Sequence, residues 1–271
     1  MKKQVSVGIA GFGKMGEACG TAFAGAGYKV YAYDVDPART VSERENVRFT
    51  GGLRELIAAS DILIVAVKPQ HIAGVLGEIR AGCIQKKPLV ISIAAGVSLG
   101  TFQKVLAHLH IVRAMPNLAA QVRASVTFLA KGPTATVRDV RVAAGLFSCL
   151  GEVIIVPESY IDKATSVTGS GPGYLFYIMD ALMQGARALG FDNERARTMV
   201  EQTVRGALLL AQNSSKDFAT LARDVASKRG TTEAALAVFK KNRLQKTIVN
   251  GVKAAYARAQ EISREINRSL E

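Results

Sequence analysis

Short apolar runs alternate with helix-like segments through the first half of the chain. The runs are rich in β-branched residues and end at glycine, proline or polar residues, as buried strands of a parallel sheet do. We predict strands over residues 5–10, 29–33, 61–67, 88–93, 111–114, 125–130 and 152–156, with a helix over 137–150. Strands that alternate with helices in this way predict a doubly wound, mainly parallel α/β sheet.

The pattern changes after Pro157, where only helical periodicity continues. We predict helices over 173–190, from Asp192 to about residue 213, and from Gln245 to about residue 269. The first is apolar on nearly all sides and should be buried. An all-helical domain of about 110 residues has little interior for such a helix. We therefore expect an α/β domain at 1–157, an all-helical domain at 158–271, and a homodimer or larger homo-oligomer whose second subunit covers this helix.

A glycine-rich segment joins the first predicted strand to a helix of small residues. It consists of Gly11, Phe12, Gly13, Lys14, Met15 and Gly16. This is G-x-G-x-x-G between a strand and a helix, the context that indicates dinucleotide binding, although glycine turns also occur without a ligand. Gly11 permits the tight turn, Gly13 lets the backbone approach a pyrophosphate, and Gly16 allows close helix–strand packing. Free N–H groups at the helix start would face the phosphates. The first domain is thus predicted to be Rossmann-type and to bind a dinucleotide.

Asp34 ends the second predicted strand, roughly 20 residues past the glycines. An acid at this position accepts hydrogen bonds from the adenosine ribose hydroxyls and repels a 2′-phosphate. We therefore expect NAD(P)H as cofactor, with NADH favoured over NADPH. Arg39 and Arg44 lie nearby and leave NADPH open.

Ligands of such sheets bind at the carboxyl ends of the strands. The third long apolar run ends in Val67, Lys68 and Pro69, and the fourth runs into Ala94-Ala95-Gly96, whose small side chains leave room for a flat ring. We therefore add Val67, Lys68, Pro69 and Ala94 to the predicted cofactor-binding residues.

Composition and charge narrow the function classes. The formal net charge is +13, but the basic residues are scattered without interleaved aromatic residues, so no nucleic-acid partner is predicted. Cys19, Cys83 and Cys149 form no C-x-x-C pair and no ligand set with the histidines, which predicts no metal site and a reducing, cytoplasmic setting. No apolar run approaches the roughly 20 residues that span a bilayer, so no membrane partner is predicted.

A second informative segment runs from Val225 to Glu233, between two predicted helices. Gly230 and Thr231 at a helix start leave backbone N–H groups free. Thr231 is then either a simple N-cap residue or part of an anion site to which Ser227 and Thr232 add hydroxyls. The residues alone leave both interpretations open.

Six segments in order give the chain a family resemblance. They are the N-terminal G-x-G-x-x-G, AVKP at 66–69, SIAAG at 92–96, RAMPN at 113–117, TGSGPGYLF at 168–176 and ASKRGTTEAAL at 226–236. Together they resemble a pyrroline-5-carboxylate reductase over essentially the whole length. The resemblance implies hydride transfer from NAD(P)H to the C=N bond of 1-pyrroline-5-carboxylate, which gives L-proline, and an all-α dimerisation domain. It also implies that Ser227, Gly230, Thr231 and Thr232 bind the substrate carboxylate and ring nitrogen.

Thr232 is the candidate catalytic residue, as a group that orients the ring nitrogen rather than a strong acid. Two residues depart from the family pattern: Arg229 replaces a glycine, at a cost in strain if φ is positive, and Asp224 replaces an asparagine and cannot donate when ionised. Reduction of a related cyclic imine and a non-catalytic, nucleotide-binding regulatory role remain alternatives. A β-hydroxyacid dehydrogenase is disfavoured, because no lysine follows the glycines at 169–171 until Lys216.

Overall fold

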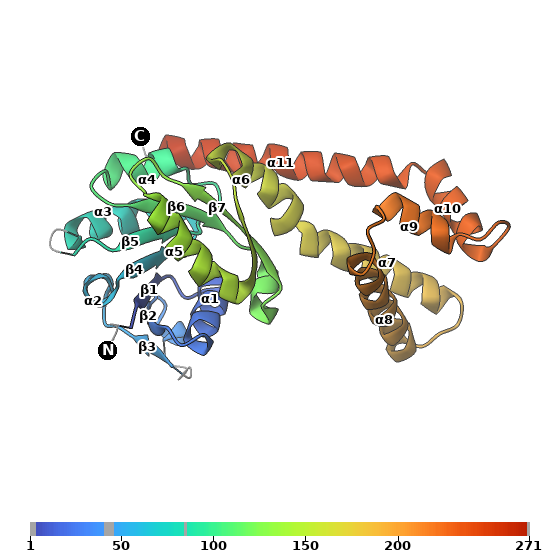
Figure 1. The fold of residues 1–271 in the computed structure, drawn as a ribbon, viewed down its shortest axis with the longest axis horizontal. Helices are drawn as coiled ribbons and strands as arrows, with labels where there is room; N and C mark the ends of the chain where they lie inside the picture. Colours follow the sequence, from blue (N-terminus) through green and yellow to red (C-terminus); the bar gives the residue numbers. More distant parts are fainter. Residues whose placement is uncertain (1–3, 41–45, 84–85, 270–271) are drawn as a thin grey trace. The chain divides into compact units, whose positions relative to one another are not determined.

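The strands of the first half form a single sheet. The computed structural model describes residues 4–40, 46–83 and 86–269, and within them the sheet has the order β3-β2-β1-β4-β5-β6-β7-β8 (Figure 1). Among the strands of these described residues, only the β6–β7 pair is antiparallel. The strands are β1 (Ser6–Ala10), β2 (Lys29–Tyr33), β3 (Val47–Phe49), β4 (Ile62–Val65), β5 (Leu89–Ser92), β6 (Ile111–Met115), β7 (Ser125–Lys131) and β8 (Gly151–Ile155). The predicted doubly wound, mainly parallel sheet is confirmed.

Helices cover both faces of this sheet. They are α1 (Lys14–Gly25), α2 (Leu53–Ala59), α3 (Ile72–Gly82), α4 (Leu99–Val105), α5 (Val137–Phe147) and the short α6 (Ile161–Ala164). Side chains of α1 and α5 pack in one apolar cluster with Ile62 and Ile64 of β4. Those of α2, α3 and α4 pack in another with Leu63 and Val65 of the same strand. This alternation explains why β4 is a continuous apolar run: both of its faces are buried.

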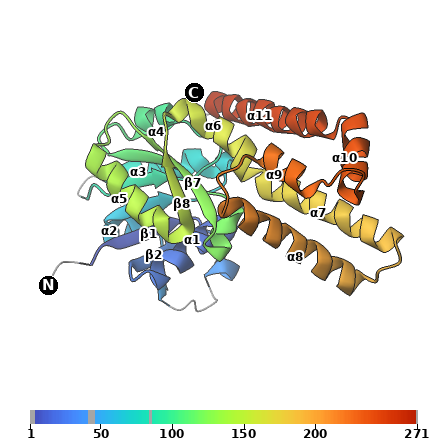
Figure 2. The same ribbon diagram turned by 45° about the vertical axis from the view of Figure 1, so that its right-hand side comes forward.

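The second half is helical, as predicted. Its helices are α7 (Gly171–Ala188), α8 (Asn193–Gln212), α9 (Phe218–Val225), α10 (Thr231–Lys241) and α11 (Leu244–Ser269) (Figure 2). By packing, the chain divides into one unit of Met1–Ser170 with Ala255–Glu271 and a second unit of Gly171–Ala254. The end of α11 thus packs with the α/β unit. Packing units need not coincide with folding domains, so the boundary after residue 157 stays a prediction.

Helix α7 is not buried within the single chain. Leu175, Phe176 and Tyr177 are 56%, 65% and 80% exposed, and no residue of α7 is fully buried. This exposure in one protomer fits the expectation that a domain of this size cannot bury such a helix by itself and that a second subunit covers it. Such an apolar surface marks an interaction site.

The end of α11 packs against the loop after β5. Gly96 has φ +75°, and a Cβ there would lie 3.0 Å from Ile262 Cγ2 and 3.1 Å from Ile266 Cδ1. Ile262 and Ile266 also join the apolar cluster that contains Ala94. This contact fixes the loop that carries one of the predicted cofactor residues.

A carboxylate at the start of α5 makes the stability of this unit depend on pH. Asp139 Oδ2 lies 2.8 Å from His110 Nδ1 and accepts 2.7 Å hydrogen bonds from the Thr136 N–H and hydroxyl. Burial raises the pKa of Asp139, but the Thr136 hydrogen bonds and His110 outweigh it and hold the pKa below 3.8. A lowered pKa in the folded state adds stability above the unfolded pKa, and this stability is lost as pH falls through the folded value.

Asp139→Asn is therefore expected to lower the free energy of unfolding at pH 7 by about 1 kcal/mol, the typical net worth of a hydrogen bond, because the N3 carboxylate of the capping box formed with Thr136 is lost. The difference from wild type should shrink below pH 3.8, where the unfolded carboxyl is already protonated. Urea unfolding at pH 7 and near pH 3 measures both effects. An equal difference at the two pH values would show that the ionised carboxylate is not responsible.

Candidate cofactor and substrate sites

The glycine loop after β1 has the backbone geometry that its sequence predicts. Gly11 has φ +95°, and a Cβ there would lie 2.9 Å from both the Ala66 carbonyl carbon and the Val67 nitrogen. A Cβ at Gly16 would overlap the carbonyl oxygen of Gly11. Both positions exclude a side chain, because the loop packs directly on β4 and α1 packs directly on the loop.

The start of α1 is open for an anion. Gly13 is the N-cap residue and supplies no side-chain hydrogen bond to the first turn, in which Lys14 and Met15 lie. The first N–H groups of a helix lack partners within it and bind phosphate oxygens. The nearest atom to a Cβ at Gly13 would be Arg39 Nη1, at 3.0 Å. The loop residues therefore fit the pyrophosphate of a dinucleotide.

Asp34 has a structural role that the sequence did not reveal. Its Oδ2 accepts a 2.6 Å hydrogen bond from the Phe12 N–H, and its Oδ1 accepts one of 2.9 Å from the Asp36 N–H. Its side chain is only 8% exposed. Asp34 thus fixes the glycine loop to the end of β2, where the adenosine ribose lies in dinucleotide-binding folds of this order. Arg44, the other nearby arginine, lies outside the described residues.

The other predicted cofactor residues follow the neighbouring strands β4 and β5. The order β3-β2-β1-β4-β5-β6 places the reversal of direction between β1 and β4, where dinucleotides bind. Val67, the exposed Lys68 and Pro69 follow β4, and the Val67 nitrogen lies beside Gly11 of the glycine loop. Ala94 follows β5 and is 3% exposed, so only a small part of it is available to a ligand.

Two buried polar residues on or after β6 carry no role in the sequence prediction. Arg113 is 3% exposed and forms ion pairs with Glu158 at 3.3 Å and Asp162 at 2.7 Å. Asn117 donates a 2.9 Å hydrogen bond from Nδ2 to the Thr168 carbonyl, at the π-helix Thr165–Gly169. Both belong to the RAMPN segment at 113–117, so the family resemblance of that segment was the sequence signal that could have pointed to them. They fix the carboxyl end of β6 to the segment that leads into α7.

The predicted substrate residues cluster at the start of α10, in the second unit. Gly230 is the N-cap residue, has no capping side chain, and donates a 2.9 Å hydrogen bond from its N–H to the Ser227 carbonyl. Among the described residues, the hydroxyls of Ser227, Thr231 and Thr232 have no hydrogen-bond partner. Free N–H groups and free hydroxyls therefore gather at one helix start, which suits a carboxylate.

Both departures from the family pattern have local partners. Arg229 has φ +60°, a left-handed conformation that costs a non-glycine residue about 1 kcal/mol or more. Its N–H donates a 2.5 Å hydrogen bond to Glu233 Oε2, which helps to hold the turn. Asp224 forms an ion pair with Lys216, in which Oδ2 lies 2.8 Å from Nζ. The expected strain at Arg229 is confirmed, and Lys216 is the local partner of Asp224.

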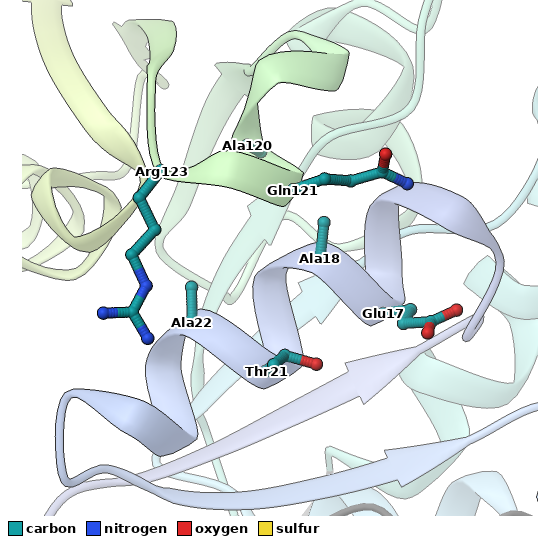
Figure 3. A pocket seen from close by; sticks show the side chains of 7 residues that line it. All are labelled: Glu17, Ala18, Thr21, Ala22, Ala120, Gln121 and Arg123. Carbon is teal, nitrogen blue, oxygen red and sulfur yellow. The ribbon is translucent and has the colours of Figure 1, made fainter.

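A separate cavity of about 290 Å³ lies between α1 and the turn Leu118–Val122, η3 (Figure 3). The polar side chains that line it come from both elements: Glu17 and Thr21 from α1, Gln121 from η3, and Arg123 from the residue after η3. None of its lining residues belongs to the predicted cofactor or substrate sets. Within the described residues, no group of three or more His, Cys, Asp or Glu side chains could hold a metal ion. No described helix is long and apolar enough to span a membrane.

Comparison with known proteins gives two family matches. Residues 6–96 match the family described as NADP oxidoreductase coenzyme F420-dependent, which fits the class of dinucleotide-binding oxidoreductase that the fold and the glycine loop define. Residues 158–262 match pyrroline-5-carboxylate reductase dimerisation.

Relatives match over nearly the whole length. The chain is 35% identical to the pyrroline-5-carboxylate reductase of Methanosarcina acetivorans, over 95% of this chain and 98% of the relative. The structure of the Coxiella burnetii pyrroline-5-carboxylate reductase superposes with a TM-score of 0.86 at 32% identity, covering 96% and 99% of the two chains. The Plasmodium falciparum pyrroline carboxylate reductase with NADP bound shares the fold, with a TM-score of 0.87 at 24% identity over 96% and 98%. The chain belongs to the pyrroline-5-carboxylate reductase family.

Proposed function

We propose that this protein reduces 1-pyrroline-5-carboxylate to L-proline with NAD(P)H, in proline biosynthesis. The observation that carries the proposal is the start of α10, where Ser227, Thr231 and Thr232 offer free hydroxyls beside uncapped N–H groups. A ligand with one carboxylate matches this set of donors. The glycine loop in the same chain fits the dinucleotide that the reaction requires.

In the proposed reaction, the cofactor and the residues of the substrate site have different roles. When bound, the reduced nicotinamide supplies the hydride, and the protein supplies orientation and electrostatics. Ser227, the turn at Gly230 and the N–H group of Thr231 hold the substrate carboxylate. The Thr232 hydroxyl, half-buried in the first turn of α10, hydrogen-bonds the ring nitrogen and orients the C=N bond. Thr232 does not titrate usefully, so the proton comes from solvent.

NADH is proposed as the favoured cofactor. Asp34 places a fixed carboxylate at the end of β2, where it can accept a ribose hydroxyl and repels a 2′-phosphate. Val67, Lys68, Pro69 and Ala94 would line the side of the site toward β4 and β5.

The protein is further proposed to act as a homodimer or larger homo-oligomer in the cytoplasm. The exposed apolar residues of α7 lie in the segment that matches the dimerisation family. Burial raises the pKa of the Cys19 thiol to about 12 and that of Cys83 to about 11, and all three cysteines are unpaired. Unpaired, unreactive thiols suit a reducing compartment.

A direct assay tests the proposal. Purified protein is mixed with 1-pyrroline-5-carboxylate and either NADH or NADPH, and the absorbance of the reduced cofactor is followed while proline is measured. Proline formation with a larger kcat/KM for NADH is expected. Turnover only with the six-membered cyclic imine would favour reduction of a related substrate. Cofactor binding without turnover of either imine would favour a regulatory protein of the same fold.

Thr232→Ala is expected to lower kcat/KM about tenfold or more, because the transition state loses one or two hydrogen bonds. Thr232→Ser keeps the hydroxyl and should retain activity within about threefold of wild type. Steady-state kinetics with both variants measure the difference. Unchanged kinetics in Thr232→Ala, or an equal loss in both variants, would remove the hydroxyl from the mechanism.

A further inference from the structure

The cavity between α1 and η3 has no role in the proposed reaction. Its floor consists of Ala18 and Ala22 of α1 and Ala120 of η3, and all three residues are buried. Methyl side chains are too short to fill the space between the two elements, so a hollow of about 290 Å³ remains. An apolar floor with a few polar groups around it is typical of a small-molecule site.

The guanidinium group of Arg123 lies at one end of this cavity (Figure 3). Its Nη2 would lie 2.8 Å from a Cβ at Gly25, the last residue of α1, so the missing side chain leaves room for it. The negative end of the helix dipole favours a cation at this place. Among the described residues, the Arg123 side chain forms no hydrogen bond or ion pair. Its donors are therefore available to a ligand.

The backbone of Arg123 is strained. Arg123 directly follows η3 and has φ +57°, and its N–H donates a 3.1 Å hydrogen bond to the Ala120 carbonyl. A left-handed conformation is unfavourable for a residue with a Cβ and costs glycine nothing. Strained residues of this kind concentrate at sites that bind ligands. The arginine is therefore better explained by a ligand for its side chain than by the needs of the turn.

The opposite end of the cavity carries a negative charge. Glu17 lies in the first turn of α1, eight residues before Gly25, which places the two positions about 12 Å apart along the helix axis. Thr21 lies between them on the same helix (Figure 3). The Thr21 hydroxyl and the Gln121 amide have no hydrogen-bond partner among the described residues. A small volume spread over this length is narrow, and it suits an unbranched chain with opposite charges at its ends.

We propose that this cavity binds a small linear molecule with a carboxylate at one end and an ammonium group at the other. The planar guanidinium of Arg123 matches the carboxylate with two parallel N–H donors. The Glu17 carboxylate takes the ammonium group, and the alkyl chain lies on the three alanines of the floor. The Gln121 amide and the Thr21 hydroxyl add hydrogen bonds along the chain. The proposal does not depend on the proposed function, because it uses none of the cofactor or substrate residues.

A series of linear probes tests the site by calorimetry on the purified full-length protein, without cofactor or imine. The probes are 4-aminobutanoate, 6-aminohexanoate and 8-aminooctanoate, together with octanoate and octylamine, which each lack one charged end. We expect 8-aminooctanoate to bind at least tenfold more tightly than 4-aminobutanoate, because only the longer chain reaches both charges. Octanoate and octylamine should each bind at least tenfold more weakly than 8-aminooctanoate. No binding of 8-aminooctanoate, or equal affinity along the series, would overturn the proposal.

Variants at the two ends assign the charges. Arg123→Gly removes the guanidinium and also the backbone strain, so it should unfold at the same or a higher temperature. It should bind 8-aminooctanoate and octanoate at least tenfold more weakly and leave the Kd for octylamine within twofold. Glu17→Gln should weaken 8-aminooctanoate and octylamine and spare octanoate. The control Arg80→Gln removes an exposed arginine from the last turn of α3 and should change no Kd.

The stability of Arg123→Gly distinguishes a ligand-binding role from a structural one. A lower unfolding temperature with unchanged affinity for 8-aminooctanoate would make Arg123 a structural residue of the turn and overturn the proposal. Equal weakening of octanoate and octylamine by Arg123→Gly would show a general disturbance rather than the loss of a carboxylate partner, and would also overturn it. Arg123→Lys keeps the charge and loses the fork, so its affinity for octanoate should fall between those of wild type and Arg123→Gly.

Discussion

Gly16→Ala is expected to abolish measurable dinucleotide binding, with a rise in Kd of at least about 100-fold, or about 2.7 kcal/mol. The added Cβ would overlap the Gly11 carbonyl oxygen, which is backbone and cannot rotate away as a side chain can. Either α1 moves away from the loop or the loop changes shape. Both movements displace the N–H groups that fit the pyrophosphate. Calorimetric titration with NADH measures the loss.

A matched glycine separates this effect from a general cost of alanine. Gly77 lies in α3 with open space around its Cβ position, so Gly77→Ala should bind NADH normally and unfold at the same or a higher temperature. Gly16→Ala should also be destabilised by about 1–3 kcal/mol, as overpacked sites are. A folded Gly16→Ala protein with wild-type affinity would show that α1 need not approach the loop closely.

The regular part of the α/β fold was predictable because each signal is local. A strand such as β4 is buried on both faces, so four successive apolar residues mark it without any knowledge of its neighbours. The glycine loop was also predictable from its own residues, because its tight turn needs a positive φ at Gly11, which glycine adopts readily. The three-residue β3 was missed, because Val47–Phe49 contains a central arginine and is too short for a pattern.

What the sequence could not show depends on contacts between distant segments. Nothing in the composition of α11 indicates that Ile262 and Ile266 contact the loop at Gly96. The sequence suggested a ribose role for Asp34 by its spacing alone. Its bond to the Phe12 N–H appears only when β1 and β2 lie side by side in register.

The sequence also could not decide between two interpretations of the predicted substrate residues. The residues at 227–233 left a plain helix cap and an anion site equally open. The structure adds that Gly230 supplies no cap and that the nearby hydroxyls are free, which favours the anion site. The left-handed Arg229 could be anticipated only from the glycine that relatives were expected to carry.

Gly230→Ala is expected to lower kcat/KM for 1-pyrroline-5-carboxylate by about 50- to 100-fold, mainly through KM. Alanine can adopt the φ of −87° found here, so the backbone conformation is not the obstacle. The obstacle is space: the Cβ would overlap Ser227 Oγ and lie 2.9 Å from the Ser227 carbonyl oxygen. It would displace the Ser227 hydroxyl and narrow the approach to the N–H groups of α10. The Kd for NADH should not change, because the cofactor residues lie in the other packing unit.

A double-mutant cycle distinguishes this mechanism from simple misfolding. Ser227→Ala removes the hydroxyl that the new Cβ would meet, so Gly230→Ala should cost less in that background than in wild type. The backbone contact at 2.9 Å persists, so part of the loss should remain. Fully additive losses in kcat/KM would mean that the two residues act independently, and a raised Kd for NADH in Gly230→Ala would mean that the substitution disturbs more than the substrate site. Either result would contradict the assignment of Ser227 and Gly230 to one carboxylate-binding turn.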